Sequence, residues 1–365
     1  MLDCLIIGNG IIALSLADQL AQAGKSVKII ERKCAGRSAS WAAGGILPPP
    51  QRKAVHEPTE QLRALSHDLY PDWIERLQRA SNIDQDFQRS GGIYLARSAG
   101  EAALMLAVVE DWQTDGVTVE RISKEELAQL EPQLDLAGIR VAYRLPDEIL
   151  VRPPRILKAL RFLLQTAGVS FQEVTNVSLN QTNDRCRIFL DGSDHEAENI
   201  IVAAGPWSTE MLDQLGIETS VEPFRGQIAM WQMDQKAIQH IINEGPRYIF
   251  ARNDNCLIAG STVEEVGFKC ETTTEGVDSL CSFASKLIPK IRDVKPTKTW
   301  AGLRPRSPDG IPLIGRVMGI DNLFVATGHF RSGIHLAPAT AVCLSQEILG
   351  QTPTVPLERF SPRRN

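Results

Sequence analysis

The chain has 365 residues, a formal net charge of −5 at pH 7 and 43% hydrophobic residues, and its sequence pI is about 5.8. This length suits about two domains of ordinary globular composition. The acidic balance argues against nucleic acid as the main partner, because phosphate backbones bind basic protein faces.

The first elements form a β-turn-α-β unit at the N-terminus. The apolar stretch LDCLIIG predicts a strand, residues 11–23 carry apolar positions at helical spacing before Gly24, and SVKIIE predicts a second strand. No basic region precedes the first apolar run, and Asn9, Asp18 and Gln19 interrupt that run. We therefore expect neither a signal peptide nor a membrane-spanning helix.

The glycines of LIIGNGIIAL, residues 5–14, have the spacing of a dinucleotide-binding turn. Gly8 permits the tight turn, and Gly10 lets the backbone approach a pyrophosphate at the N-terminus of the following helix. Ala13 stands where a third glycine is often found. Glu31 follows at the end of the second strand, where a carboxylate can accept hydrogen bonds from ribose hydroxyls and would repel a 2′-phosphate. The spacing disfavours NADP and leaves FAD and NAD open, the alternative being an incidental glycine turn.

The middle of the chain predicts loops and helices in alternation. GRSASWAAGGILPPP predicts a loop, because its prolines exclude a helix. Helices are expected over 58–80 and 101–113, and a third begins at the capping box of Ser123 and Glu126. VRPPRILKALRFLLQTAGVSFQEV predicts a helix that Gly168 closes before a strand, and ENIIVAAGPWS predicts a buried strand with a small-residue turn.

From residue 221 the pattern changes to neighbouring strands. FRGQIAMWQ, RYIFAR and CLIAGST predict strands, with NDN as a hairpin turn. A helix at about 275–289, strands at KTWAGLR and NLFVATG, and a helix from residue 333 complete the chain. We expect the chain to cross more than once between an α/β domain and a mainly antiparallel one.

Cysteine and histidine patterns point to no metal and no disulfide framework. The seven cysteines are scattered and form no CxxC, which favours reduced thiols in a cytosolic protein. No His/Cys cluster has metal-ligand spacing, so no metal is expected.

The C-terminal stretches TWAGLRPRSPDGIPLIGRV and NLFVATGHFRSGIHLAPATA closely resemble the glycine oxidases of thiamine biosynthesis, within the wider family of D-amino acid and sarcosine oxidases. SWAAGGI, LEPQL, AAGPWS, FRGQ and RYIFAR support the resemblance in the family's order. It implies FAD, a Rossmann-like domain and an antiparallel sheet over the flavin's reactive face. It places the FAD-binding domain in residues 1–83, 148–218 and 305–365, and the substrate-binding domain in residues 84–147 and 219–304.

The resemblance also assigns roles to particular residues. Arg304 in GLRP matches the arginine that binds the substrate carboxylate, Tyr248 in RYIF matches the tyrosine that assists it, and Arg331 in GHFRSG matches a position at the flavin and substrate pocket. A planar guanidinium suits this role because it grips a carboxylate through two parallel hydrogen bonds. The remaining residues expected around FAD are Gly8, Gly10, Ile11, Ile12, Glu31, Arg32, Ser38, Ala39, Ala42, Ala43, Gly44, Gly45, Val174, Ala204, Gly205, Trp207, Gly328, His329, Ser332, Gly333 and Ile334.

Three positions depart from the family pattern. Val263 stands where glycine oxidases can have a methionine over the flavin, and Pro246 and Arg247 stand where a His-Cys pair can occur. Monomeric sarcosine oxidases tether the flavin through a cysteine in the stretch that matches WAGLRPRSPDG, which has none here. We therefore expect a differently shaped pocket wall and non-covalent FAD.

The implied reaction is the oxidation of glycine, sarcosine or similar small amino acids by hydride transfer to flavin N5. The products are an imine, then a 2-oxo acid with ammonia or an amine, and hydrogen peroxide. The expected partners are the amino acid and molecular oxygen, without nucleic acid or membrane, and family analogy adds a cytoplasmic homo-oligomer. Two other interpretations are a D-amino acid dehydrogenase of the same fold, serving a quinone or carrier, and a non-catalytic flavoprotein.

Overall fold

The computed structural model describes residues 2–33 and 38–362. Cys34 lies outside these residues, while Cys4, Cys186, Cys256 and Cys343 are buried free thiols. In the described part of the chain, no helix is long and apolar enough to cross a membrane. Nor do the described residues bring together a group of His, Cys, Asp or Glu side chains that could hold a metal ion.

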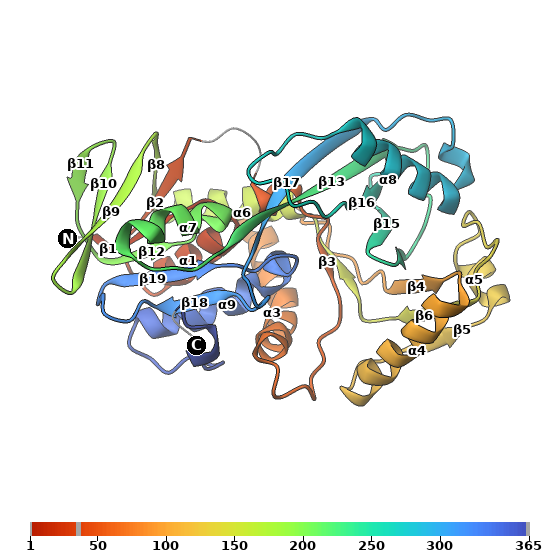
Figure 1. Ribbon diagram of the computed structural model, residues 1–365, viewed down its shortest axis with the longest axis horizontal. Helices are drawn as coiled ribbons and strands as arrows, with labels where there is room; N and C mark the ends of the chain where they lie inside the picture. Colours follow the sequence, from red (N-terminus) through yellow and green to blue (C-terminus); the bar gives the residue numbers. More distant parts are fainter. Residues whose placement is uncertain (1, 34–37, 363–365) are drawn as a thin grey trace.

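A six-stranded sheet forms one end of the molecule (Figure 1). Its pairs are parallel except β18–β19. Its order is β18 (Leu313–Arg316), β19 (Leu323–Thr327), β12 (Ala197–Val202), β1 (Leu2–Ile7), β2 (Val27–Arg32) and β8 (Ser170–Val174). Strand β1 buries Cys4 and Ile6 in one core and Leu5 and Ile7 in another, which is why its sequence is an unbroken apolar run.

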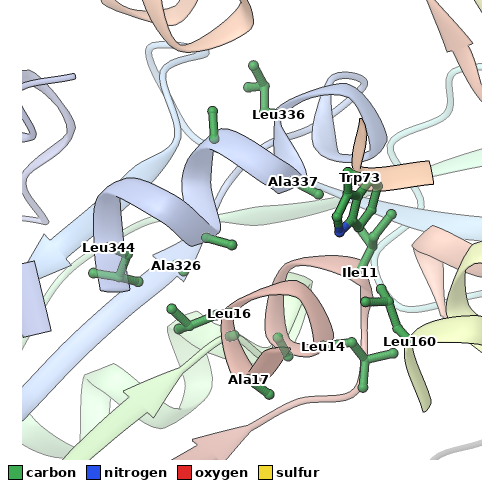
Figure 2. Close-up of a cluster of buried hydrophobic side chains, with 14 of the residues drawn as sticks. Ile11, Leu14, Leu16, Ala17, Trp73, Leu160, Ala326, Leu336, Ala337 and Leu344 are labelled. Carbon is green, nitrogen blue, oxygen red and sulfur yellow. The ribbon is translucent and has the colours of Figure 1, made fainter. Parts of the chain in front are cut away.

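Helices cover one face of this sheet. They are α1 (Ile11–Gln22), α3 (Pro58–Ser81), α6 (Pro153–Thr166) and α9 (Gly333–Ile348). Figure 2 shows Leu14 and Leu16 of α1 near Leu160 of α6 and Leu344 of α9. Each such fully buried leucine contributes about 1.5–3 kcal/mol. This packing fixes the N-terminus of α1 at the carboxyl edge of the sheet.

The opposite face is covered by a small three-stranded sheet and a short helix. The sheet is β11 (Ser193–His195), β10 (Arg185–Leu190) and β9 (Val177–Thr182), and the helix is α7 (Ser208–Leu212). Ile188 of β10 and Met211 of α7 share a core with Leu5 and Ile7 of β1. Short 3-10 helices are η1 (Gly205–Trp207), η2 (Asp213–Leu215), η3 (Pro289–Ile291) and η4 (Glu358–Phe360).

An eight-stranded sheet forms the other part of the molecule (Figure 1). Its order is β17 (Lys298–Arg306), β13 (Glu222–Gln232), β16 (Cys256–Gly260), β15 (Arg247–Ala251), β14 (Ile241–Glu244), β4 (Gly92–Ala96), β6 (Val141–Leu145) and β5 (Glu120–Ile122). All pairs are antiparallel except β14–β4. Helix α8 (Thr274–Leu287) packs against β13 and β16, α4 (Ala99–Thr114) packs against β4, and α5 (Lys124–Leu130) packs against β6.

The strands of the two sheets come from the interleaved segments expected for two domains. The six-stranded sheet uses only residues within 1–83, 148–218 and 305–365, and the other sheet crosses these limits only at the end of β17. The expected architecture, an α/β unit joined to a mainly antiparallel one by several crossings, is therefore present. The domain boundaries themselves stay a prediction.

One predicted loop contains a helix. Residues Ala39–Ala42 form α2, whose N-cap Ser38 accepts a hydrogen bond from Trp41 N at 3.2 Å. The expectation that prolines exclude a helix here is wrong, because residues 48–50 lie beyond this single turn. The loop also holds β3 (Ile46–Leu47), which pairs with β7 (Ile149–Leu150).

Candidate active site

A cavity of about 960 Å³ extends from the carboxyl edge of the six-stranded sheet to one face of the eight-stranded sheet. Its walls include the N-terminus of α1, helix α2, the 3-10 helix η1, the N-terminus of α9 and residues of β13, β14, β15 and β17. This volume lies at the upper end of the range for small-molecule sites. It is the place where the two parts of the fold meet.

The turn between β1 and α1 is built for close backbone approach. Gly8 has φ +128°, and a Cβ there would lie 2.3 Å from the Ala203 carbonyl oxygen, so only glycine fits. Gly10 is the N-cap of α1 and has no side chain with which to cap the helix. Ile11 N donates to Ser40 Oγ at 3.0 Å. The helix N-terminus therefore faces the cavity with its partial positive charge.

Glu31 occupies the expected place at the end of β2. Its Oε1 is buried and makes no hydrogen bond among the described residues, although the Arg161 guanidinium of α6 lies within ion-pair distance. Arg161 in turn lies over the Phe171 ring, 4.4 Å from its centroid. Glu31 therefore presents an ion-paired carboxylate at the cavity wall, where it is placed to accept hydrogen bonds from a ligand with hydroxyl donors.

Helix α2 and the residues after it form the middle of the cavity wall. Trp300 of β17 donates from Nε1 to the Ala42 carbonyl oxygen at 3.0 Å, which ties α2 to the second sheet. Gly45 has φ +81°, and a Cβ there would lie 2.1 Å from the Val151 carbonyl oxygen. These small residues let the segment pass close beneath a ligand.

Arg304 of β17 projects into the cavity across β13. Its Nη2 donates to Ser261 Oγ at 2.7 Å and its Nη1 donates to the Thr262 carbonyl oxygen at 3.2 Å. A Cβ on Gly226 would lie 2.1 Å from Nη2, so the guanidinium occupies space that only a glycine leaves open. Burial lowers the pKa of Arg304, and among the described residues no carboxylate forms an ion pair with it.

Tyr248 of β15 lies beside Arg304 in a slot formed by two further glycines. A Cβ on Gly260 would lie 2.6 Å from its hydroxyl oxygen, and one on Gly44 would lie 2.8 Å from it. The ring stacks on Phe250, with centroids 5.8 Å apart. Burial raises the pKa of Tyr248, and the charge of Arg304 opposes part of that rise. The hydroxyl is therefore a neutral donor at physiological pH.

The loop from β19 to α9 closes the third side of the cavity. Arg331 is exposed at the cavity wall, and its charge also bears on Arg304 and Tyr248. Burial lowers the pKa of His329 to about 3, and its Nε2 lies 3.2 Å from Thr340 Oγ1. His329 is therefore neutral at physiological pH, which suits packing better than proton transfer.

The structure brings nearly all the predicted site residues together around this one cavity. Two of them do not line it. The carbonyl of Val174 accepts a hydrogen bond from Lys33 N at 2.8 Å, and Glu173 is the neighbour that reaches the wall. Gly328, with φ +80°, packs toward Ser307.

Several residues of the cavity wall were not predicted. On the substrate side they include Tyr94, Glu148 and Asn243. They stand singly on short strands or in a turn, without the glycine spacing or family motif that marked the other residues. Among the departures from the family pattern, Arg247 and Pro246 line the cavity, whereas Val263 is exposed and does not. Arg247 donates to Ser279 Oγ at 2.6 Å.

The residues present fit a flavin dinucleotide. The glycine turn and the N-terminus of α1 suit a pyrophosphate, the carboxylate of Glu31 at the cavity wall suits ribose hydroxyls, and Ala39 and Ala42 of α2 leave room for a planar ring system. The second end of the cavity carries the guanidinium of Arg304, which forms no ion pair with a carboxylate of the described residues. The arrangement can therefore hold a dinucleotide at one end and a small carboxylate at the other.

Comparisons with known proteins agree with this geometry. The profile of the family described as FAD dependent oxidoreductase matches residues 3–347. A glycine oxidase of Pseudomonas aeruginosa is 33% identical over 98% of this chain and 97% of its own. The crystal structure of glycine oxidase from Geobacillus kaustophilus superposes with a TM-score of 0.93, at 27% identity, over 100% of this chain and 98% of that one. That of iminodiacetate oxidase from Chelativorans sp. BNC1 gives 0.90, at 27% identity, over 98% of both chains.

Proposed function

The chain belongs to the FAD dependent oxidoreductase family and is an FAD-dependent amino acid oxidase, and we propose that it holds glycine or a similarly small amino acid by its carboxylate on Arg304. The observation that carries this proposal is the guanidinium of Arg304 in its glycine-made slot, without an anionic partner among the described residues. A substrate carboxylate would supply that partner.

Each residue of the site would contribute to orientation or charge. Arg304 would bind the carboxylate through two hydrogen bonds, which set its distance and its angle, and Tyr248 would donate a further hydrogen bond to it. When bound, the flavin supplies the two-electron acceptor for oxidation of the substrate α-carbon. The N-terminus of α9 at Gly333 would favour negative charge at the cavity wall. We further propose non-covalent FAD, molecular oxygen as acceptor, and a cytoplasmic homo-oligomer.

The test compares substrates with and without a carboxylate. Arg304→Ala should lower kcat/KM for glycine by roughly 30- to 5,000-fold, because truncating one partner of a buried charge pair costs about 2–5 kcal/mol. Tyr248→Phe should cost less, about 1.5–3 kcal/mol for one hydrogen bond to a charged group. The rate of anaerobic flavin reduction, monitored by flavin absorption, measures the effect of both substitutions.

Simple amines without a carboxylate provide the control. They should be poor substrates of the wild type and nearly insensitive to Arg304→Ala. FAD content should be unchanged in both variants. Equal losses for glycine and simple amines would show that Arg304 does not recognise the carboxylate.

A further inference from the structure

The wall of the cavity contains a buried carboxyl group that neither the carboxylate grip nor the dinucleotide end uses. Glu148 follows β6 and precedes β7, and its side chain is 1% exposed. Its Oε2 makes no hydrogen bond with any described residue. A Cβ on Gly92 would lie 1.7 Å from this oxygen, so the carboxyl occupies the space above a glycine of β4.

Two further polar side chains lie beside Glu148 on the same face of the sheet. Tyr248 of β15 pairs with Asn243 of β14, and Asn243 pairs with Tyr94 of β4. Directly opposed residues of neighbouring strands point to the same face. Tyr94, Asn243, Glu148 and Tyr248 all line the cavity. Tyr94 and Tyr248 are two strands apart, which separates their backbones by about 10 Å.

Glu148 and Asn243 are the hydrogen-bond donors that this recess offers at neutral pH, because the Tyr94 hydroxyl already donates to Glu148. Burial raises the pKa of Glu148 to about 8, and the hydrogen bond from Tyr94 offsets only part of that rise. Burial and the neighbouring Glu148 also raise the pKa of Tyr94 well above its ordinary value. Asn243 Nδ2 is buried without a partner among the described residues. No described Lys or Arg forms an ion pair with Glu148.

A buried carboxyl without a cation stays protonated and can donate a hydrogen bond, as in enzymes that use such an acid to hold an oxyanion. The orphaned Oε2 of Glu148 and Nδ2 of Asn243 therefore both need an acceptor from outside the protein. A ligand that brings oxygen acceptors and no donors satisfies them together.

We propose that Glu148 and Asn243, with Tyr94 holding Glu148 in position, form a second subsite of the substrate cavity, which receives a distal carboxylate of an amino acid already held by Arg304 and Tyr248. The preferred substrate class is then an amino acid with two carboxylates, the second on its nitrogen or its side chain. This inference rests on the proposed function of Arg304. It extends that function from glycine to longer substrates of the same reaction.

The first experiment separates binding from chemistry. Diglycolate has two carboxylates and no oxidisable amine, and methoxyacetate has the same backbone with one carboxylate. Perturbation of the flavin absorption in the holoenzyme gives both dissociation constants. Wild type should bind diglycolate roughly 10- to 100-fold more tightly at pH 7, the worth of a hydrogen bond to a charged group. This preference should fall above pH 8, where Glu148 loses its proton and repels the second carboxylate.

Glu148→Gln is the informative variant, because an amide keeps a donor and does not titrate. It should keep the preference for diglycolate and extend it unchanged to pH 9.5. Glu148→Ala and Asn243→Ala should reduce the preference at least tenfold. Glu347→Gln is the matched control, since Glu347 also has a buried unpartnered Oε2 and a raised pKa but lies outside the cavity. It should change neither the preference nor its pH dependence.

Turnover then identifies the charge that the recess accepts. Iminodiacetate, its monoamide and N-(2-aminoethyl)glycine have similar length and differ in the charge of the distal group. Wild type should favour iminodiacetate in kcat/KM. A preference for the cationic substrate that Glu148→Gln abolishes, or equal binding of diglycolate and methoxyacetate, would overturn the proposal. If the enzyme oxidises glycine but prefers neither diglycolate nor iminodiacetate, the proposed function stands and the second subsite is refuted. If it oxidises no amino acid, the proposed function and the second subsite are both refuted.

Discussion

Gly226→Ala should impair substrate binding by Arg304 although the arginine itself is unchanged. The new Cβ would lie 2.1 to 2.3 Å from Nη2, Nη1 and Cζ of Arg304, where 3.4 Å is ordinary contact. The guanidinium must therefore retreat by about 1 Å, a displacement that can cost 10²-fold in rate. The obstacle is the far end of a flexible side chain, so the fold can accommodate the methyl group more easily than the site can.

We expect kcat/KM for glycine to fall about 100-fold, or about 2.7 kcal/mol. FAD content should stay at the wild-type level and the melting temperature should change little. Gly100→Ala is the control glycine, because a Cβ there meets no atom within 4 Å. It lies in α4, away from the cavity, and should leave the kinetics unchanged.

A double-mutant cycle makes the reasoning refutable. If Gly226→Ala acts through the guanidinium, it should add almost nothing to Arg304→Ala, since the displaced group is already gone. Additive losses would show that the methyl group acts by another route. A collapse of the melting temperature in Gly226→Ala alone would show that the strand, and not the side chain, absorbs the change.

The remaining predictions concern the cofactor and pH. Gly10→Val should lose FAD, because a side chain there occupies space that the pyrophosphate needs, and the absorption spectrum of the purified variant measures the loss. Acid precipitation of the wild type should release its flavin; flavin that stays in the pellet would contradict non-covalent binding. Because the pKa of Glu148 is raised from 4.5 to about 8, the folded state holds its proton more tightly. Stability should therefore fall as pH rises from 4.5 to 8, by up to about 1.4 kcal/mol per unit. Glu148→Gln should remove this slope in urea unfolding, and a parallel pH dependence of both proteins would refute it.

The elements that local sequence predicts well are those with strong periodicity or turn chemistry. The strand, helix and second strand around Gly8 and Gly10 fall where their pattern indicates, as do α6 and α9. Short strands escaped prediction, both at sheet edges and inside the sheets: they are β3, β4, β5, β6, β7, β9, β10, β11, β14 and β18. Such strands carry too few residues for an alternation to stand out, and their stability comes from neighbours in the sheet.

Local sequence by itself determined the cofactor turn. The turn requires residues without side chains at two positions, and Gly8 and Gly10 supply them within the first ten residues. The flanking motifs also marked Arg304 and Tyr248 as candidates for substrate binding; the structure places both at the cavity, and their role stays a prediction. Only the tertiary structure joined Gly226 to Arg304, and Gly92 to Glu148. These pairs lie far apart in the chain, and strand register sets Gly226 against β17, whereas the fold of a turn lays Glu148 over Gly92. Arg304 and Glu148 fit only because the neighbouring glycine has no side chain, and which residues become neighbours is decided when the sheet forms.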